Sequence, residues 1–128
     1  MNLLLDTHTF IWWDSNASHL SQKAQALIGD PSNSIYLSLV SIWEIQIKRN
    51  LGKLQIRKPI QDILTEQRAN GVNTLQIEIK HLIELDNLPN HHKDPFDRLL
   101  IAQAASEGLT LLTKDKFFQD YQVSVIWD

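Results

Sequence analysis

The chain alternates short apolar runs with longer segments of helical periodicity. Five runs have the length and composition of strands, at residues 3–6, 34–38, 74–77, 109–113 and 123–127. Five segments have a helical pattern, at residues 21–28, 41–50, 59–71, 79–86 and 94–107. Strands that alternate with helices favour a parallel sheet covered on both faces. The pattern therefore predicts a three-layer α/β/α fold with a central, mostly parallel sheet of about five strands.

The length and composition suit one small domain. At 128 residues, one domain over residues 1–128 is expected. The chain holds no cysteine, which removes disulfides, thiolate zinc sites and cysteine nucleophiles, and suits a reducing compartment. The N-terminus lacks a basic leader, and no apolar run approaches the roughly 20 residues that span a bilayer. We therefore expect a soluble, cytoplasmic protein without a membrane partner.

The net charge of −3 is unusual for a chain that handles nucleic acid, because phosphate-binding proteins tend to be basic. Carboxylates that bind a metal would account for part of this acidity. The basic residues are unevenly placed, and five of them gather in one stretch: Lys48, Arg49, Lys53, Arg57 and Lys58. This stretch is either a solvated surface or a contact for RNA, so the charge balance neither supports nor excludes nucleic acid.

Two aspartates come at the ends of predicted strands. Asp6 closes the first apolar run, and Asp115 follows the fourth. Each can be a turn residue or the N-cap of the next helix. In open parallel sheets, however, ligands gather beyond the carboxyl ends of the strands, so both are also candidate site residues. Their neighbours Thr7 and Thr113 can supply hydroxyl groups that orient a carboxylate.

Two further acidic positions lie in the first turns of predicted helices. Ser41 and Glu44 have the spacing of a capping box, and we expect Ser41 to cap the helix while Glu44 faces the site. Asp94 followed by Pro95 has the pattern of an N-cap and a first-turn proline. Asp97 lies one turn further on and can face the same side. The local sequence leaves open whether Asp94 or Asp97 binds a metal.

Acidic residues that follow the strands of a parallel sheet can converge at one edge. At a separation of about 5 Å and an effective dielectric constant near 20, each like-charge pair costs on the order of 3 kcal/mol. A folded chain gathers such a cluster only with compensation, and oxygen ligands without cysteine favour Mg²⁺ or Mn²⁺ over zinc. A phosphoacceptor signalling domain also uses strand-end aspartates and Mg²⁺. The run at residues 34–38 lacks the aspartate that such a domain needs.

Five segments together resemble the PIN-domain nucleases, in particular the toxin subunits of VapBC-type toxin–antitoxin pairs. They are LLLDTHTFIWW at 3–13, VSIWEIQIK at 40–48, GKL at 52–54, DPFDRLLIAQA at 94–104 and LLTKD at 111–115. The resemblance covers essentially the whole chain. It implies the PIN fold, hydrolysis of RNA with Mg²⁺ or Mn²⁺ as cofactor, an antitoxin that covers the acidic site, and a homodimer.

Carried onto this sequence, the resemblance implies a catalytic and metal-binding quartet of Asp6, Glu44, Asp97 and Asp115. It selects Asp97 over Asp94, which remains the cap and a candidate contact for a metal-bound water. Thr7 and Thr113 match supporting hydroxyls. Five further residues are candidate RNA contacts: Lys48, Arg49, Lys53, His92 and Arg98. The alternative function is a catalytically silent binding module with the same fold, against which the intact quartet argues.

Overall fold

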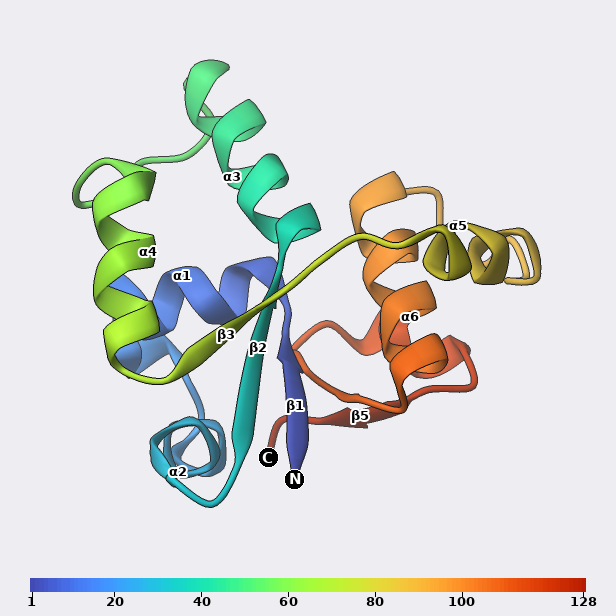
Figure 1. Ribbon diagram of the computed structural model, residues 1–128, viewed down its shortest axis with the longest axis horizontal. Coiled ribbons are helices and arrows are strands. Elements are labelled where there is room, and N and C mark those ends of the chain that lie inside the picture. Colours follow the sequence, from blue (N-terminus) through green and yellow to red (C-terminus); the bar gives the residue numbers. More distant parts are fainter.

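The computed structural model describes residues 1–128, which form a five-stranded sheet with helices on both faces (Figure 1). The strand order is β3-β2-β1-β4-β5, and every neighbouring pair is parallel. The strands are β1 (Asn2–Leu5), β2 (Ser34–Ser38), β3 (Val72–Leu75), β4 (Thr110–Leu112) and β5 (Ser124–Ile126). The predicted α/β class with a central sheet is confirmed, and the sheet is parallel throughout.

Six α-helices and two short 3-10 helices connect the strands. They are α1 (Thr7–Ser15), η1 (Ala17–His19), α2 (Gln22–Gly29), α3 (Leu39–Asn50), α4 (Ile60–Ala69), α5 (Ile79–Asp86), α6 (Pro95–Glu107) and η2 (Lys116–Asp120). Gly108 ends α6 in the left-handed conformation, with φ of 66°, and donates its N–H to the carbonyl of Ala104. Glycine adopts this conformation without a steric penalty, as the predicted helix end requires.

The prediction that Ser41 caps α3 was wrong. The helix begins at Leu39, and the side chain of Ser38 caps it by accepting a hydrogen bond from the Val40 N–H at 3.0 Å. Ser41 and Glu44 therefore lie within the helix, where both are buried. The strand ends directly at the helix, so the first serine after the apolar run has the extended backbone that an N-cap needs.

The core lies on both faces of the sheet because successive side chains of a strand point to opposite sides. On β1, Leu3 and Leu5 pack with α1, α2 and α4, whereas Leu4 packs with α6. All three leucines are completely buried, which explains the unbroken apolar run at the start of the chain. None of the helices combines the length and apolar character that crossing a membrane requires.

The order in which the chain adds strands to the sheet reverses between β1 and β4. From β1 the chain continues to β2 and then β3 on one side, whereas β4 and β5 lie on the other side of β1 (Figure 1). The segments that leave the carboxyl ends of β1 and β4 therefore diverge, which opens a crevice at this edge. Asp6 immediately follows β1, and Asp115 follows β4 by three residues. This topology brings sequence-distant acidic residues to one place.

Candidate metal centre

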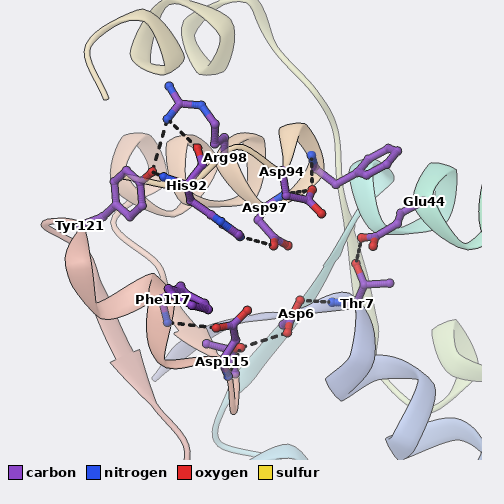
Figure 2. A network of polar contacts seen from close by, with 12 residues as sticks. Asp6, Thr7, Glu44, His92, Asp94, Asp97, Arg98, Asp115, Phe117 and Tyr121 are labelled. Carbon is purple, nitrogen blue, oxygen red and sulfur yellow. Dashed lines mark hydrogen bonds and ion pairs between the residues drawn. The ribbon is translucent and has the colours of Figure 1, made fainter. Parts of the chain in front are cut away.

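Four carboxylates from four parts of the chain open into one cavity of about 370 Å³. Asp6 lies at the end of β1, Glu44 in α3, Asp97 in the first turn of α6, and Asp115 before η2 (Figure 2). The rest of the lining is His8, Trp12, Lys48, Asp94 and Lys114. The structure thus brings together all four positions expected from the sequence.

The carboxylate of Asp6 is buried and held by two donors. The backbone N–H of Thr7 donates to Oδ1 at 2.7 Å, and the hydroxyl of Thr113 donates to Oδ2 at 2.9 Å. Burial raises the pKa of Asp6, while the Thr113 hydrogen bond and the nearby His8 act in the opposite direction. Each oxygen retains a lone pair, so the carboxylate caps α1 and still faces the cavity.

Glu44 is buried beside Asp6 and has one hydroxyl and one cation as partners. The hydroxyl of Thr7 donates to its Oε1 at 2.7 Å, and Lys48, one helical turn further on, forms an ion pair with Oε2. Burial alone would lower the pKa of Lys48, but the hydrogen bond and charge of Glu44, with the charges of Asp94 and Asp97, raise it. Lys48 therefore supplies positive charge to the acidic cavity.

Asp94 and Asp97 have different tasks. The Oδ1 atom of Asp94 accepts hydrogen bonds from the backbone N–H groups of Phe96 and Asp97, at 2.9 and 3.1 Å, so Asp94 is the predicted N-cap of α6. Asp97 points into the cluster, and its Oδ2 lies 2.9 Å from Nε2 of His92 (Figure 2). Asp94 also lines the cavity, and it does so as a residue already engaged with the backbone.

The environment of Asp97 disfavours its charged form. Burial raises the pKa of Asp97 to about 7; the hydrogen bond with His92 opposes this shift, and the charges of Asp6, Asp94 and Glu44 add to it. Asp97 is therefore only partly ionised at neutral pH, and a cation bound beside it would favour its charged form.

Asp115 completes the cluster from the other side of the cavity. Its Oδ1 accepts from the N–H of Phe117 at 2.9 Å, and its own N–H donates to the Thr113 hydroxyl at 3.0 Å. Ligand atoms of His92, Asp97 and Asp115 lie within 4.8 Å of one another. The carboxylate oxygens retain lone pairs, and the cavity holds too little positive charge to neutralise them. They therefore fit a divalent cation that prefers oxygen ligands, such as Mg²⁺ or Mn²⁺.

The family model of the PIN domain matches residues 3–123. The chain belongs to the PIN domain family. It is 28% identical over 121 residues to Ribonuclease VapC22 of Mycobacterium tuberculosis, and the alignment covers 94% of this chain and 92% of that relative. PIN domains are typically metal-dependent, which agrees with the acidic cluster.

Solved structures show the same fold. The PIN domain described here is similar to VapBC2 from Rickettsia felis, solved with a DNA fragment of its promoter, at a TM-score of 0.76, 18% identity and 100% coverage of both chains. It is also similar to VapBC-1 from nontypeable Haemophilus influenzae, at a TM-score of 0.67 and 18% identity, covering 98% and 97% of the two chains. A third similar structure is FitAcB from Neisseria gonorrhoeae, at a TM-score of 0.61 and 16% identity, with 97% and 96% coverage.

The basic stretch at residues 48–58 divides into two parts in this PIN domain. Lys48 lines the cavity, Lys53 lines an adjoining hollow, and Arg49 is exposed on the same helix. The other two cations form ion pairs with acidic side chains: Arg57 with Asp14 and Glu66, and Lys58 with Glu66. Arg49 and Lys53 have no acidic partner and remain candidate RNA contacts with Lys48, which pairs with Glu44 inside the cavity, whereas Arg57 and Lys58 are largely neutralised.

His92 and Arg98 hold the loop before α6. His92 contacts Asp97 through its ring and donates its backbone N–H to the Tyr121 hydroxyl at 2.9 Å. Arg98 donates to the carbonyl of Pro89 at 2.9 Å and lies 3.3 Å from the same Tyr121 hydroxyl. Arg98 therefore points into the loop, away from Asp97.

Three residues that line the cavity are not among the site residues expected from the sequence: His8, Trp12 and Lys114. Lys114 lies between Thr113 and Asp115, directly after a strand, and this position is a signal that could have identified it. His8 and Trp12 lie one turn apart on α1, which the sequence pattern did not predict, so their shared face was not visible.

Thr7→Val should destabilise the protein by about 1–3 kcal/mol, because buried Glu44 loses its hydroxyl donor while the shape of the side chain is kept. Urea denaturation in EDTA measures this change. Thr65→Val removes an exposed hydroxyl that bonds within α4 and is the matched control, with an expected change below about 0.5 kcal/mol. Equal effects of the two substitutions would contradict the assigned role of Thr7.

Proposed function

We propose that this PIN domain is a metal-dependent endoribonuclease, the toxin of a toxin–antitoxin pair. One observation carries the proposal: Asp6, Glu44, Asp97 and Asp115 face one cavity at the switch point of the sheet, and Lys48 is the cation paired with them. This arrangement suits phosphodiester hydrolysis, in which charge on the phosphate must be neutralised while water attacks. The relationship to a ribonuclease relative supports RNA as the substrate.

The chain's own residues have separable tasks in this reaction. The four carboxylates hold one or two Mg²⁺ or Mn²⁺ ions, which supply activation of water and neutralisation of the phosphate when bound. Thr7 and Thr113 fix the inner carboxylates, Glu44 and Asp6. Asp97 or Asp115 accepts a proton from the attacking water. The expected products carry a 5′-phosphate and a 3′-hydroxyl, because water and not the RNA 2′-hydroxyl is the nucleophile.

An antitoxin is the proposed protein partner. The similar structures come from toxin–antitoxin proteins of several bacteria, including VapBC2 of Rickettsia felis and VapBC-1 of Haemophilus influenzae. Such a partner would inhibit the enzyme by covering the acidic cavity. A homodimer is proposed from the resemblance to the VapBC-type toxins.

The test is cleavage of a mixed RNA pool by the purified protein in Mg²⁺, in Mn²⁺ and in EDTA. We expect cleavage only with metal, and 5′-phosphate ends that a 5′-phosphate-dependent exonuclease can degrade. Binding of Mn²⁺ without cleavage of any RNA would favour a silent module. Cleavage that persists in EDTA would contradict the proposal.

A further inference from the structure

Phe117 is a large apolar residue that is exposed to solvent, and it follows Asp115 of the acidic cavity by two residues. The neighbouring Phe118 is 1% exposed and belongs to the core, whereas 59% of Phe117 is accessible. The hydrophobic core therefore uses one ring of this pair and leaves the other in solvent. The exposed ring is therefore available to stack on a ligand.

Phe117 is connected to the acidic cluster through its backbone and through its ring (Figure 2). Its backbone N–H donates to Asp115 at 2.9 Å, and its ring stacks against that of His92, with the ring centroids 5.5 Å apart and the planes inclined by 17°. His92 in turn contacts Asp97 at 2.9 Å and is anchored by Tyr121. The ring therefore lies close to Asp115 through its own backbone, and it is joined to Asp97 through His92.

Four of the twelve lysines and arginines form ion pairs with acidic side chains, which reduces the positive charge available for contacts with phosphate. Ion pairs engage Lys48, Arg57, Lys58 and Lys80, and the net charge is −3. Proteins that bind single-stranded nucleic acid obtain affinity from stacking of bases on aromatic rings as well as from charge. A nuclease with a net negative charge would depend more on such stacking.

We propose that Phe117, backed by His92, is a stacking site for one unpaired nucleobase next to the scissile phosphate. This inference rests on the proposed RNA cleavage. A phosphate placed between Asp97 and Asp115 has the base of an adjacent nucleotide near this ring, because Asp115 bonds to the backbone of Phe117 and Asp97 contacts His92, on which the ring stacks. The site takes an unstacked base, so the substrate is a single-stranded segment or loop.

The test compares Phe117→Ala and Phe117→Trp on a short unstructured RNA with one cleavage site. We expect the alanine variant to lower kcat/KM by about 10- to 100-fold, mainly through KM, and the tryptophan variant to retain activity. RNAs that lack one base, each at a different position near the cleavage site, locate the stacked nucleotide. On the RNA that lacks the stacked base, the wild type and Phe117→Ala should have equal kcat/KM.

Ile83→Ala is the matched control, since Ile83 is likewise apolar and 60% exposed but lies on α5, which contributes no residue to the cavity lining. Equal losses for Phe117→Ala on complete RNA, on every abasic RNA and on bis(p-nitrophenyl) phosphate would mean that the ring only supports Asp115, which overturns the stacking site. Unchanged cleavage of all substrates would overturn it as well, including the case in which Phe117 serves a protein partner.

A binding experiment tests the stacking site independently of RNA cleavage. Fluorescence anisotropy of the same labelled RNA is measured in Ca²⁺, for the wild type and for Phe117→Ala. Weaker binding by the variant on complete RNA, and equal binding on the RNA that lacks the stacked base, support the stacking site even if the wild type cleaves nothing. Equal binding of complete RNA by both proteins contradicts it.

Discussion

Asp97→Asn should lower metal-dependent RNA cleavage by at least about 10³-fold while making the metal-free protein more stable. Asn keeps the size of the side chain and an oxygen that can face His92, but it removes the negative charge proposed to hold the cation. The loss is measured as kcat/KM on a defined RNA. Retention of cleavage by this variant would contradict the assignment of Asp97 to the metal centre.

The gain in stability follows from the same crowding of charge. Because the pKa of Asp97 is raised to about 7 by burial and by neighbouring carboxylates, its ionised form opposes folding at pH 8. Removing that charge should raise the free energy of unfolding in EDTA by about 2–4 kcal/mol, read from urea denaturation. Asp62→Asn removes an exposed charge in the first turn of α4, and this control should change stability by less than about 1 kcal/mol and leave cleavage intact.

The first strand was predictable because of its burial. Leu3, Leu4 and Leu5 are buried on both faces of the sheet, so the first strand is a continuous apolar run that needs no long-range information. Helix α1 was missed for the opposite reason. Its bulky residues, such as Phe10 and Trp12, have modest helix propensity and form no stripe of helical period, so its helical structure depends on contacts with the rest of the protein.

The acidic positions could be found from the sequence but could not be assigned by local rules. Asp6, Asp94 and Asp115 all cap helices in the structure, as their positions suggested. Capping uses one lone pair of one oxygen, so a cap can also face a cavity. What distinguishes Asp97 from Asp94 is its surroundings in three dimensions, above all burial and the nearby Asp6 and Glu44.

Contacts between distant parts of the chain left no pattern in the sequence. Arg57 pairs with Asp14, 43 residues away, and this pairing removes it from the candidate RNA surface. Thr113 lies 107 residues from Asp6, whose carboxylate it orients. The sequence thus identified residues with the right chemistry, whereas their partners follow from the order of the strands.

Metal-free protein should lose stability as the pH rises from about 4 to 7. The pKa of Asp97 is raised to about 7 in the folded state from an ordinary value of 3.8, and burial also raises the pKa of Asp6. Between these pH values the folded protein holds more protons than the unfolded chain, so the free energy of unfolding falls with pH, by up to about 1.4 kcal/mol per pH unit for each such group. Above pH 7 the contribution of Asp97 is constant.

Bound metal should reverse this trend, because it favours the ionised carboxylates. Below pH 7 the affinity for Mn²⁺ should rise with pH by up to about tenfold per unit for each proton released. The rise in Tm on adding Mn²⁺ should therefore be larger at pH 8 than at pH 5. Thermal unfolding from pH 4.5 to 8, in EDTA and in Mn²⁺, measures both effects. The Asp97→Asn variant should show a weaker dependence of Tm on pH under both conditions. A metal-free protein that gains stability between pH 5 and 7 would show that the crowded carboxylates do not titrate as their burial requires.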